Sequence, residues 1–137
     1  MFSPISRELP GDVEEIVSSV EVVSLTDPPH RGRYLGVWDT GAMLSIITPK
    51  IFSELGLTQT GKTFARGVLG KGEWIPTTFI TIILEDKIRI EDIRVAVSEI
   101  PESDMLIGFD VIKKGDFSIK NLGKNILFTF TYSASLP

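Results

Sequence analysis

The chain of 137 residues contains no cysteine and only one histidine, His30. Without cysteine, disulfide bonds and thiolate zinc sites are excluded, and a reducing compartment is permitted. His30 stands beside two prolines and has no second histidine with which to share a metal ion. We therefore expect no metal and no other cofactor in this protein.

Long apolar runs and an excess of basic residues are also missing. The longest apolar stretch, residues 79–84, is interrupted by Thr81 and is far too short to span a bilayer. The first 25 residues include a single basic residue, Arg7, and no continuous apolar segment of the kind found in export signals. The net charge of −4 comes with no basic stripe. These absences predict a cytoplasmic protein without membrane or nucleic-acid partners.

The length and the hydrophobic content are typical of one folded domain. Hydrophobic residues make up 42% of the chain, which is ample material for a packed core. We place the domain over residues 18–132 and treat residues 133–137 as a C-terminal tail. The sequence leaves open whether residues 1–17 are a pro-segment, a linker or a dimer arm.

Apolar residues recur at every second position through most of the chain, which is typical of strands. Strands are predicted over residues 18–25, 33–39, 62–69, 73–85, 88–97, 117–119 and 126–132. Thr48, Pro49 and Gly56 suit the N-cap, the first position and the C-terminal stop of a short helix. A second short helix is predicted over residues 109–114. Many short strands with two short helices favour an all-β fold in the form of a small closed β-barrel.

One tetrapeptide, Asp39-Thr40-Gly41-Ala42, places a carboxylate and a glycine at the end of a predicted strand. A hydroxyl residue, Ser45, follows six positions after the aspartate, and a glycine-rich hairpin follows some thirty residues later. Leu106-Ile107-Gly108 then precedes the second short helix. This ordered set, spread over about residues 20–130, resembles the active-site pattern of the retropepsins, which are single-domain aspartic proteases.

The resemblance implies a closed barrel of the retropepsin (acid protease) type and an aspartic endopeptidase that cleaves peptide or protein substrates. Asp39 would supply half of a catalytic pair of aspartates that share the acid and base roles, Gly41 would let the backbone approach its carboxylate, and Thr40 would bond across a dimer axis. Peptide hydrolysis without a metal needs a base to activate water and an acid to protonate the carbonyl oxygen. Two carboxylates about 3 Å apart fill both roles, because like charges that close share one proton.

The number of Asp-Thr-Gly motifs bears on the assembly of the protein. The chain has a single copy, at residues 39–41, and therefore supplies half of a carboxylate pair. A two-fold homodimer completes the pair. The resemblance further implies a flap, a hairpin that closes over bound peptide. The residues expected to bind substrate from the loop and the flap are Ala42, Val68, Leu69, Gly70, Lys71 and Gly72.

Simpler interpretations of the acidic and hydroxyl residues remain open. Asp39 could be a turn aspartate that caps its own backbone, and Ser45 could be a small polar residue before the helix. Three other aspartates could supply a second carboxylate in the same chain, but their helix and turn positions favour solvated or capping roles. They are Asp104, Asp110 and Asp116.

Three residues depart from the usual retropepsin pattern. Met43 and Leu44 replace residues that are often polar, and Trp38 is bulkier than the aliphatic residue that usually precedes the aspartate. These departures keep an alternative function open, a non-catalytic or weakly catalytic module that binds peptide or dimerises.

Overall fold

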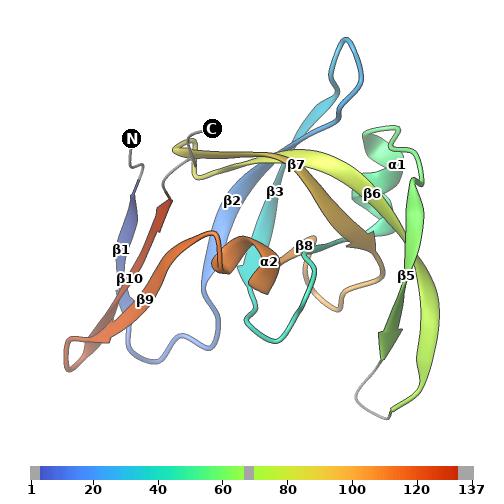
Figure 1. Ribbon diagram of the computed structural model, residues 1–137. Helices are drawn as coiled ribbons and strands as arrows, with labels where there is room; N and C mark the ends of the chain where they lie inside the picture. Colours follow the sequence, from blue (N-terminus) through green and yellow to red (C-terminus); the bar gives the residue numbers. More distant parts are fainter. Residues whose placement is uncertain (1–3, 67–69, 133–137) are drawn as a thin grey trace.

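The computed structural model describes residues 4–66 and 70–132, and strands dominate it (Figure 1). In chain order the elements are β1 (Ile5–Pro10), β2 (Val17–Val23), β3 (Arg31–Trp38), β4 (Ile46–Ile47), α1 (Pro49–Glu54), β5 (Gly61–Arg66), β6 (Gly72–Leu84), β7 (Ile88–Val97), β8 (Met105–Ile107), α2 (Phe109–Ile112), β9 (Gly115–Asn121) and β10 (Asn125–Tyr132). The strands form two sheets, one large and one small.

The larger sheet is a closed barrel. Its strands follow the order β2-β3-β8-β4-β7-β6-β5, and β2 also pairs with β6, so the strands from β2 to β6 close into a ring from which β5 extends. Side chains at every second position face inward, which buries Val20 and Val22 of β2 and Ile80 and Ile82 of β6 completely. The predicted all-β barrel with two short helices is confirmed.

Both helices are short, and within the described residues neither has the length and hydropathy needed to cross a membrane. Thr48 occupies the N-cap position of α1, but its side chain makes no capping hydrogen bond. Gly56 follows α1 with a φ of +58°, a conformation that glycine adopts without steric cost. α2 ends at Ile112 rather than at the predicted Lys114, because the Lys114 N–H bonds only three residues back and the last turn tightens before β9 begins.

The smaller sheet has the order β1-β10-β9 and joins the two ends of the described chain. β1 runs antiparallel to β10, with Ile5 opposite Phe130. Ile5, Phe128 and Phe130 are completely buried. The N-terminal segment, whose role the sequence left open, therefore contributes a strand to the core of the domain.

Trp38, the last residue of β3, joins the small sheet to the barrel. Its Nε1–H donates a hydrogen bond to the Ser18 hydroxyl oxygen at 2.8 Å. Its indole contacts three phenylalanine rings of β9 and β10 at centroid distances between 4.9 and 5.7 Å, those of Phe117, Phe128 and Phe130. The bulky residue before the aspartate thus fills the space between the two sheets.

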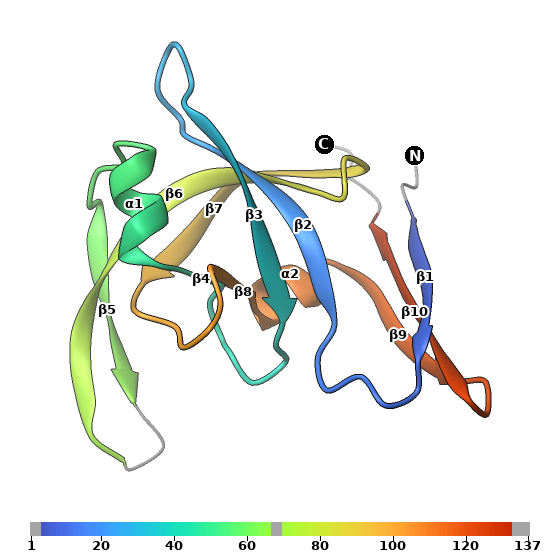
Figure 2. The ribbon, with the colours of Figure 1, turned by 180° about the vertical axis from the view of Figure 1, so that it is seen from behind.

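β8 lies between two strands that are consecutive in the chain. It pairs in parallel with β3 and antiparallel with β4. The segment 39–45, which links β3 to β4, therefore passes around the end of β8. In both views this loop lies at the same end of the molecule as the end of β5 and the start of β6 (Figures 1 and 2).

Candidate active site

Asp39 directly follows β3 and is the first residue of the loop 39–45, which passes around the end of β8. Its backbone N–H donates to the Ile107 carbonyl oxygen at 2.8 Å, which continues the ladder between β3 and β8. Its Oδ1 accepts the Gly41 N–H at 2.8 Å, and a Cβ at Gly41 would stand only 3.2 Å from this oxygen. The Asp39 side chain is half-buried, so part of the carboxylate still faces solvent. Backbone groups thus fix the position of this acid.

The loop that carries Asp39 is seated on the start of α2, and Gly108 makes this contact possible. A Cβ at Gly108 would stand 2.7 Å from the Ala42 carbonyl oxygen and 2.9 Å from the Leu44 carbonyl oxygen. Both neighbours are backbone atoms, so any side chain at this position would displace the loop. The Phe109 N–H also donates to the Ala42 oxygen, at 2.7 Å. The Asp39 loop can therefore pass this close to the start of α2 only because the residue before the helix is a glycine.

Ser45 anchors the far end of the same loop. The residue is completely buried. Its hydroxyl donates to Asp110 Oδ1 at 2.8 Å, and its backbone N–H donates to Asp110 Oδ2 at 3.0 Å. The Ser45 hydroxyl oxygen also accepts the Gly108 N–H at 2.9 Å. The hydroxyl six positions after Asp39 is therefore a buried hydrogen-bond centre that ties the loop to β8 and α2.

Asp110 is the site residue whose role sequence reasoning missed. It was predicted to be solvated or capping, and it does accept the Val111 N–H at 2.9 Å. Its main partner is Ser45, which binds both carboxylate oxygens from 65 residues earlier in the chain. Such a distant partner leaves no local pattern. The available signal was the pairing of a hydroxyl shortly after Asp39 with an acid shortly after Gly108.

The remaining loop residues predicted for the site lie next to Asp39 on the outside of the molecule. Thr40 and Gly41 are exposed, and Ala42 is half-buried by its contact with α2. Met43 has 86% of its side chain exposed, and Phe109 has 49% exposed. The acid is therefore surrounded by accessible backbone and by apolar side chains that nothing in the described chain covers.

The hairpin residues predicted to bind substrate are described in part. Gly70, Lys71 and Gly72 are exposed where the chain enters β6, whereas Val68 and Leu69 lie outside the described residues. β5 and β6 form the predicted antiparallel hairpin. A Cβ at Gly72 would stand 2.2 Å from the Phe64 ring, so this glycine lets the ring lie across the hairpin.

Trp74 packs on its own hairpin. Its ring meets the Phe64 ring edge-on at a centroid distance of 5.3 Å. The Lys62 ammonium lies 5.2 Å from the centre of the indole. Because these contacts join β5 to β6, they stiffen the hairpin where it leaves the barrel.

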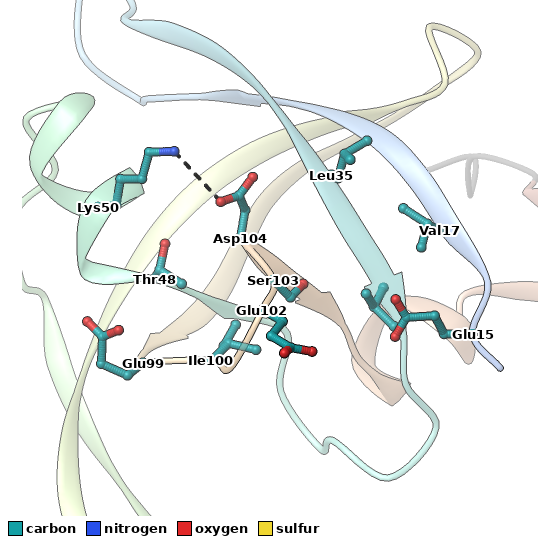
Figure 3. A pocket seen from close by; sticks show the side chains of 11 residues that line it. Glu15, Val17, Leu35, Thr48, Lys50, Glu99, Ile100, Glu102, Ser103 and Asp104 are labelled. Carbon is teal, nitrogen blue, oxygen red and sulfur yellow. Dashed lines mark ion pairs between the residues drawn. The ribbon is translucent and has the colours of Figure 1, made fainter.

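Two cavities are lined in part by residues that follow β7. The larger, of about 480 Å³, borders β3 and is lined by Val37, Thr48 and the segment 99–104 among others (Figure 3). The smaller, of about 380 Å³, lies between the start of β6 and Ser98. Across residues 4–66 and 70–132, no group of three or more histidine, cysteine, aspartate and glutamate side chains is arranged to hold a metal ion.

Comparisons with known proteins agree with this geometry. A family model described as aspartyl protease matches residues 33–111, which is more than half of the chain and includes the Asp39 loop and Gly108. No curated protein matches the chain.

Solved structures share the fold. The chain is similar to a retropepsin-like aspartic protease from Rickettsia conorii, with a TM-score of 0.60 and 12% identity over 98% of this chain and 97% of that one. It is also similar to the EIAV protease complexed with an inhibitor, with a TM-score of 0.52 and 24% identity over 75% of this chain and 89% of that one. With its Asp-Thr-Gly loop inside the matched region and a retropepsin-like barrel around it, the chain belongs to the aspartyl protease family.

Proposed function

We propose that this protein is an aspartic endopeptidase that hydrolyses peptide bonds with a water activated between Asp39 and the Asp39 of a second copy. The observation that supports the proposal most strongly is the way in which backbone groups hold the Asp39 side chain in place. Backbone bonds from Gly41 and to Ile107 fix it at the end of β3, while its carboxylate stays half-exposed. A turn aspartate would make the Gly41 bond too, but the aspartyl protease match around it favours catalysis.

A second copy is the source of the second carboxylate in this proposal. Asp110 lies close by on α2, but Ser45 binds both of its oxygens and holds it in a structural role. A two-fold dimer would instead bring two identical Asp39 side chains to the axis. Two carboxylates about 3 Å apart cannot both ionise, so they hold one proton between them and titrate as a pair.

The chemistry of such a pair needs no covalent intermediate. The ionised Asp39 takes a proton from the bound water as the water oxygen attacks the carbonyl carbon, and the protonated Asp39 of the other copy donates to the carbonyl oxygen. A tetrahedral diol forms. The carbon–nitrogen bond then breaks as the amine nitrogen receives a proton from one carboxyl group and the other carboxylate takes a proton from a diol hydroxyl. The products are a carboxylic acid and an amine, and the pair again holds one proton.

Exposed apolar residues beside the Asp39 loop support a face that a second copy covers. Met43 and Phe109 are exposed there by 86% and 49%. β9 follows α2 directly, pairs only with β10 among the described strands, and exposes 52% of Ile119. A free strand edge with apolar side chains favours pairing with another chain. We place the dimer contact on this face, with the exposed Thr40 hydroxyl bonding across the axis.

The hairpin of β5 and β6 is the proposed flap. It lies at the same end of the molecule as the Asp39 loop (Figures 1 and 2). Gly70 has a φ of +80°, and no atom of the described residues lies within 4 Å of the place where its Cβ would stand, which leaves space for bound peptide. An extended substrate could add to this hairpin through backbone hydrogen bonds, and closure of the hairpin would exclude water. Val68 and Leu69 complete the proposed flap.

Incubation with denatured casein and with a peptide library tests the proposed activity. We expect the wild-type protein to release fragments and the Asp39→Asn variant, which keeps a side-chain oxygen for the Gly41 N–H, to release none. The matched control is Asp27→Asn, because Asp27 is an exposed acid in the loop between β2 and β3, outside the proposed active site and dimer contact. Gel filtration of the same samples is expected to show a dimer.

Other outcomes have distinct meanings. A dimer that binds peptides without cleaving them would support the alternative, a peptide-binding or dimerisation module. Fragment release by Asp39→Asn at the wild-type rate would contradict the role of Asp39.

A further inference from the structure

We propose that the cavity beside β3 is a specificity subsite that receives a positively charged side chain, arginine or lysine, of the peptide substrate. This inference rests on the proposed peptidase function and adds a substrate preference to it. The cavity has a volume of about 480 Å³ and is lined by side chains from β2, β3, α1, residue 15 and the segment 99–104 (Figure 3). Its position, its floor, its rim and one buried hydroxyl all point to the same kind of occupant.

The cavity starts next to the catalytic loop. Val37 lines it and lies two residues before Asp39. Side chains alternate along an extended strand, so Val37 and Asp39 face the same side, about 7 Å apart along the chain. A peptide whose scissile bond lies at Asp39 therefore reaches the cavity with a side chain within about two residues of that bond.

The floor of the cavity is apolar and suits the stem of a long side chain. Val17, Leu35, Val37 and Ile100 form it. Leu35 has 58% of its surface exposed although it is a leucine in the middle of a strand. The methylene groups of arginine and lysine cover such surface while the charged group stays at the edge.

The rim of the cavity carries more negative than positive charge. Glu15, Glu99, Glu102 and Asp104 line it, and Lys50 is the cation among the lining residues. Lys50 pairs with Asp104 at 3.8 Å (Figure 3), and no described basic residue forms an ion pair with the other three acids. These carboxylates surround the cavity without converging into a metal-binding group. The arrangement therefore complements an organic cation that enters between them.

One buried polar group in the cavity wall lacks a partner. Thr48 lines the cavity and is 7% exposed, yet within the described residues its hydroxyl forms no hydrogen bond. Buried hydroxyl groups are normally satisfied. A guanidinium or ammonium group carries several N–H donors and no acceptor, so it could supply the missing bond to the Thr48 oxygen.

The test compares cleavage of peptides that differ only in the residue that enters the cavity. We expect the wild-type protein to favour arginine or lysine over norleucine at one position within two residues of the scissile bond, by about 10-fold in kcat/KM. The double variant Glu99→Gln and Glu102→Gln is expected to lose most of this preference. Glu91→Gln, an exposed acid on β7 outside this cavity, is the matched control and is expected to keep the preference.

Binding separates this inference from the proposed function. Fluorescence anisotropy of labelled arginine and norleucine peptides is measured with Asp39→Asn protein, with and without the two glutamine substitutions. Selective binding of the arginine peptide that the substitutions abolish supports the subsite, even where wild-type protein cleaves nothing and the peptidase proposal fails. Cleavage without a charge preference, or a preference that survives both substitutions, overturns the subsite and leaves the peptidase proposal intact.

Discussion

The Ser45 hydroxyl and the Asp110 carboxylate lie 2.8 Å apart and hold the Asp39 loop onto α2. The Ser45 backbone N–H adds a second bond to the same carboxylate at 3.0 Å, and the Gly108 N–H bonds to the hydroxyl oxygen at 2.9 Å. These bonds are largely shielded from water, because Ser45 is completely buried. The position of the proposed catalytic acid thus depends on a pair of side chains that take no part in the chemistry.

Ser45→Ala is expected to lower the free energy of unfolding by about 1–3 kcal/mol, because it leaves the buried Gly108 N–H without an acceptor and removes the hydroxyl donor to Asp110. Asp110 keeps the bonds from the Ser45 and Val111 backbone N–H groups. Urea denaturation measures the change. Ser118→Ala is the matched control, since the Ser118 hydroxyl also bonds to a side chain, Thr129, but in an exposed position. Its effect should stay within about 0.5 kcal/mol. Equal effects of the two substitutions would show that the Ser45 network contributes no special stability.

Gly108→Ala is expected to abolish most peptidase activity, because the new Cβ would stand 2.7 Å from the Ala42 carbonyl oxygen and push the Asp39 loop off α2. The expected loss of stability is about 1–3 kcal/mol. Gly123→Ala separates loop displacement from a general loss of stability. Gly123 has a φ of +94° in a turn with open space around it, so alanine there adds backbone strain of about 1 kcal/mol without touching the site. Full activity of Gly108→Ala would contradict the close contact between the Asp39 loop and the start of α2.

Substitution of the two tryptophans is expected to change the stability of the protein by different amounts. Trp38→Phe removes the 2.8 Å bond to Ser18 and part of the contact with the small sheet, so we expect the free energy of unfolding to fall by about 1–3 kcal/mol. Trp74→Phe should change it by less than about 0.5 kcal/mol, since 61% of Trp74 is exposed. Chemical denaturation followed by circular dichroism compares the two. A larger effect at Trp74 would mean that the small sheet is not joined to the barrel through Trp38.

Ionisation of Tyr34 is expected to lower the stability of the protein in strong alkali. Burial, together with the 2.9 Å bond from the Tyr34 hydroxyl to Glu54, raises the pKa of Tyr34 to about 12 from its usual 10. The folded state therefore favours the protonated phenol. Its contribution to stability is fully present below about pH 10 and is lost as the pH rises through about 12.

Ultraviolet absorbance of tyrosinate, compared between wild type and Tyr34→Phe, isolates this titration. The difference between the two proteins should develop near pH 12. A midpoint near pH 10 in the folded protein would show that Tyr34 is neither buried nor bonded to Glu54.

Much of the barrel could be predicted from the sequence because its strands are amphipathic. The alternation of apolar residues in 73–85 and 88–97 marks β6 and β7 closely, and Pro49 and Gly56 mark α1. β1 was not predicted, since Ile5–Pro10 contains only two large apolar residues and its partner, β10, lies at the other end of the chain. Pairing over such a distance leaves no local pattern in the sequence.

The candidate site, too, could be predicted from the sequence only in part. The Asp-Thr-Gly loop carries its own short motif, and its place at the end of a strand follows from the apolar run before it. The requirement for glycine at position 108 and the role of Asp110 arise only when the loop crosses the end of β8, so they became visible in the structure. The cavity beside β3 gathers four segments of the chain, at residues 15–17, 35–37, 48–50 and 99–104, and was equally hidden. A cytoplasmic location stays a prediction from the sequence.

The central claim, that Asp39 acts together with the Asp39 of a second copy, is tested most directly by mixing wild-type and Asp39→Asn chains. The two are unfolded together, refolded at a constant total concentration and assayed for peptide hydrolysis across a range of ratios. If every active centre needs one intact Asp39 from each copy, activity follows the square of the wild-type fraction, and an equal mixture keeps about one quarter of the wild-type rate. A linear fall, with about one half of the rate in the equal mixture, would mean that each chain works alone and would contradict the proposal.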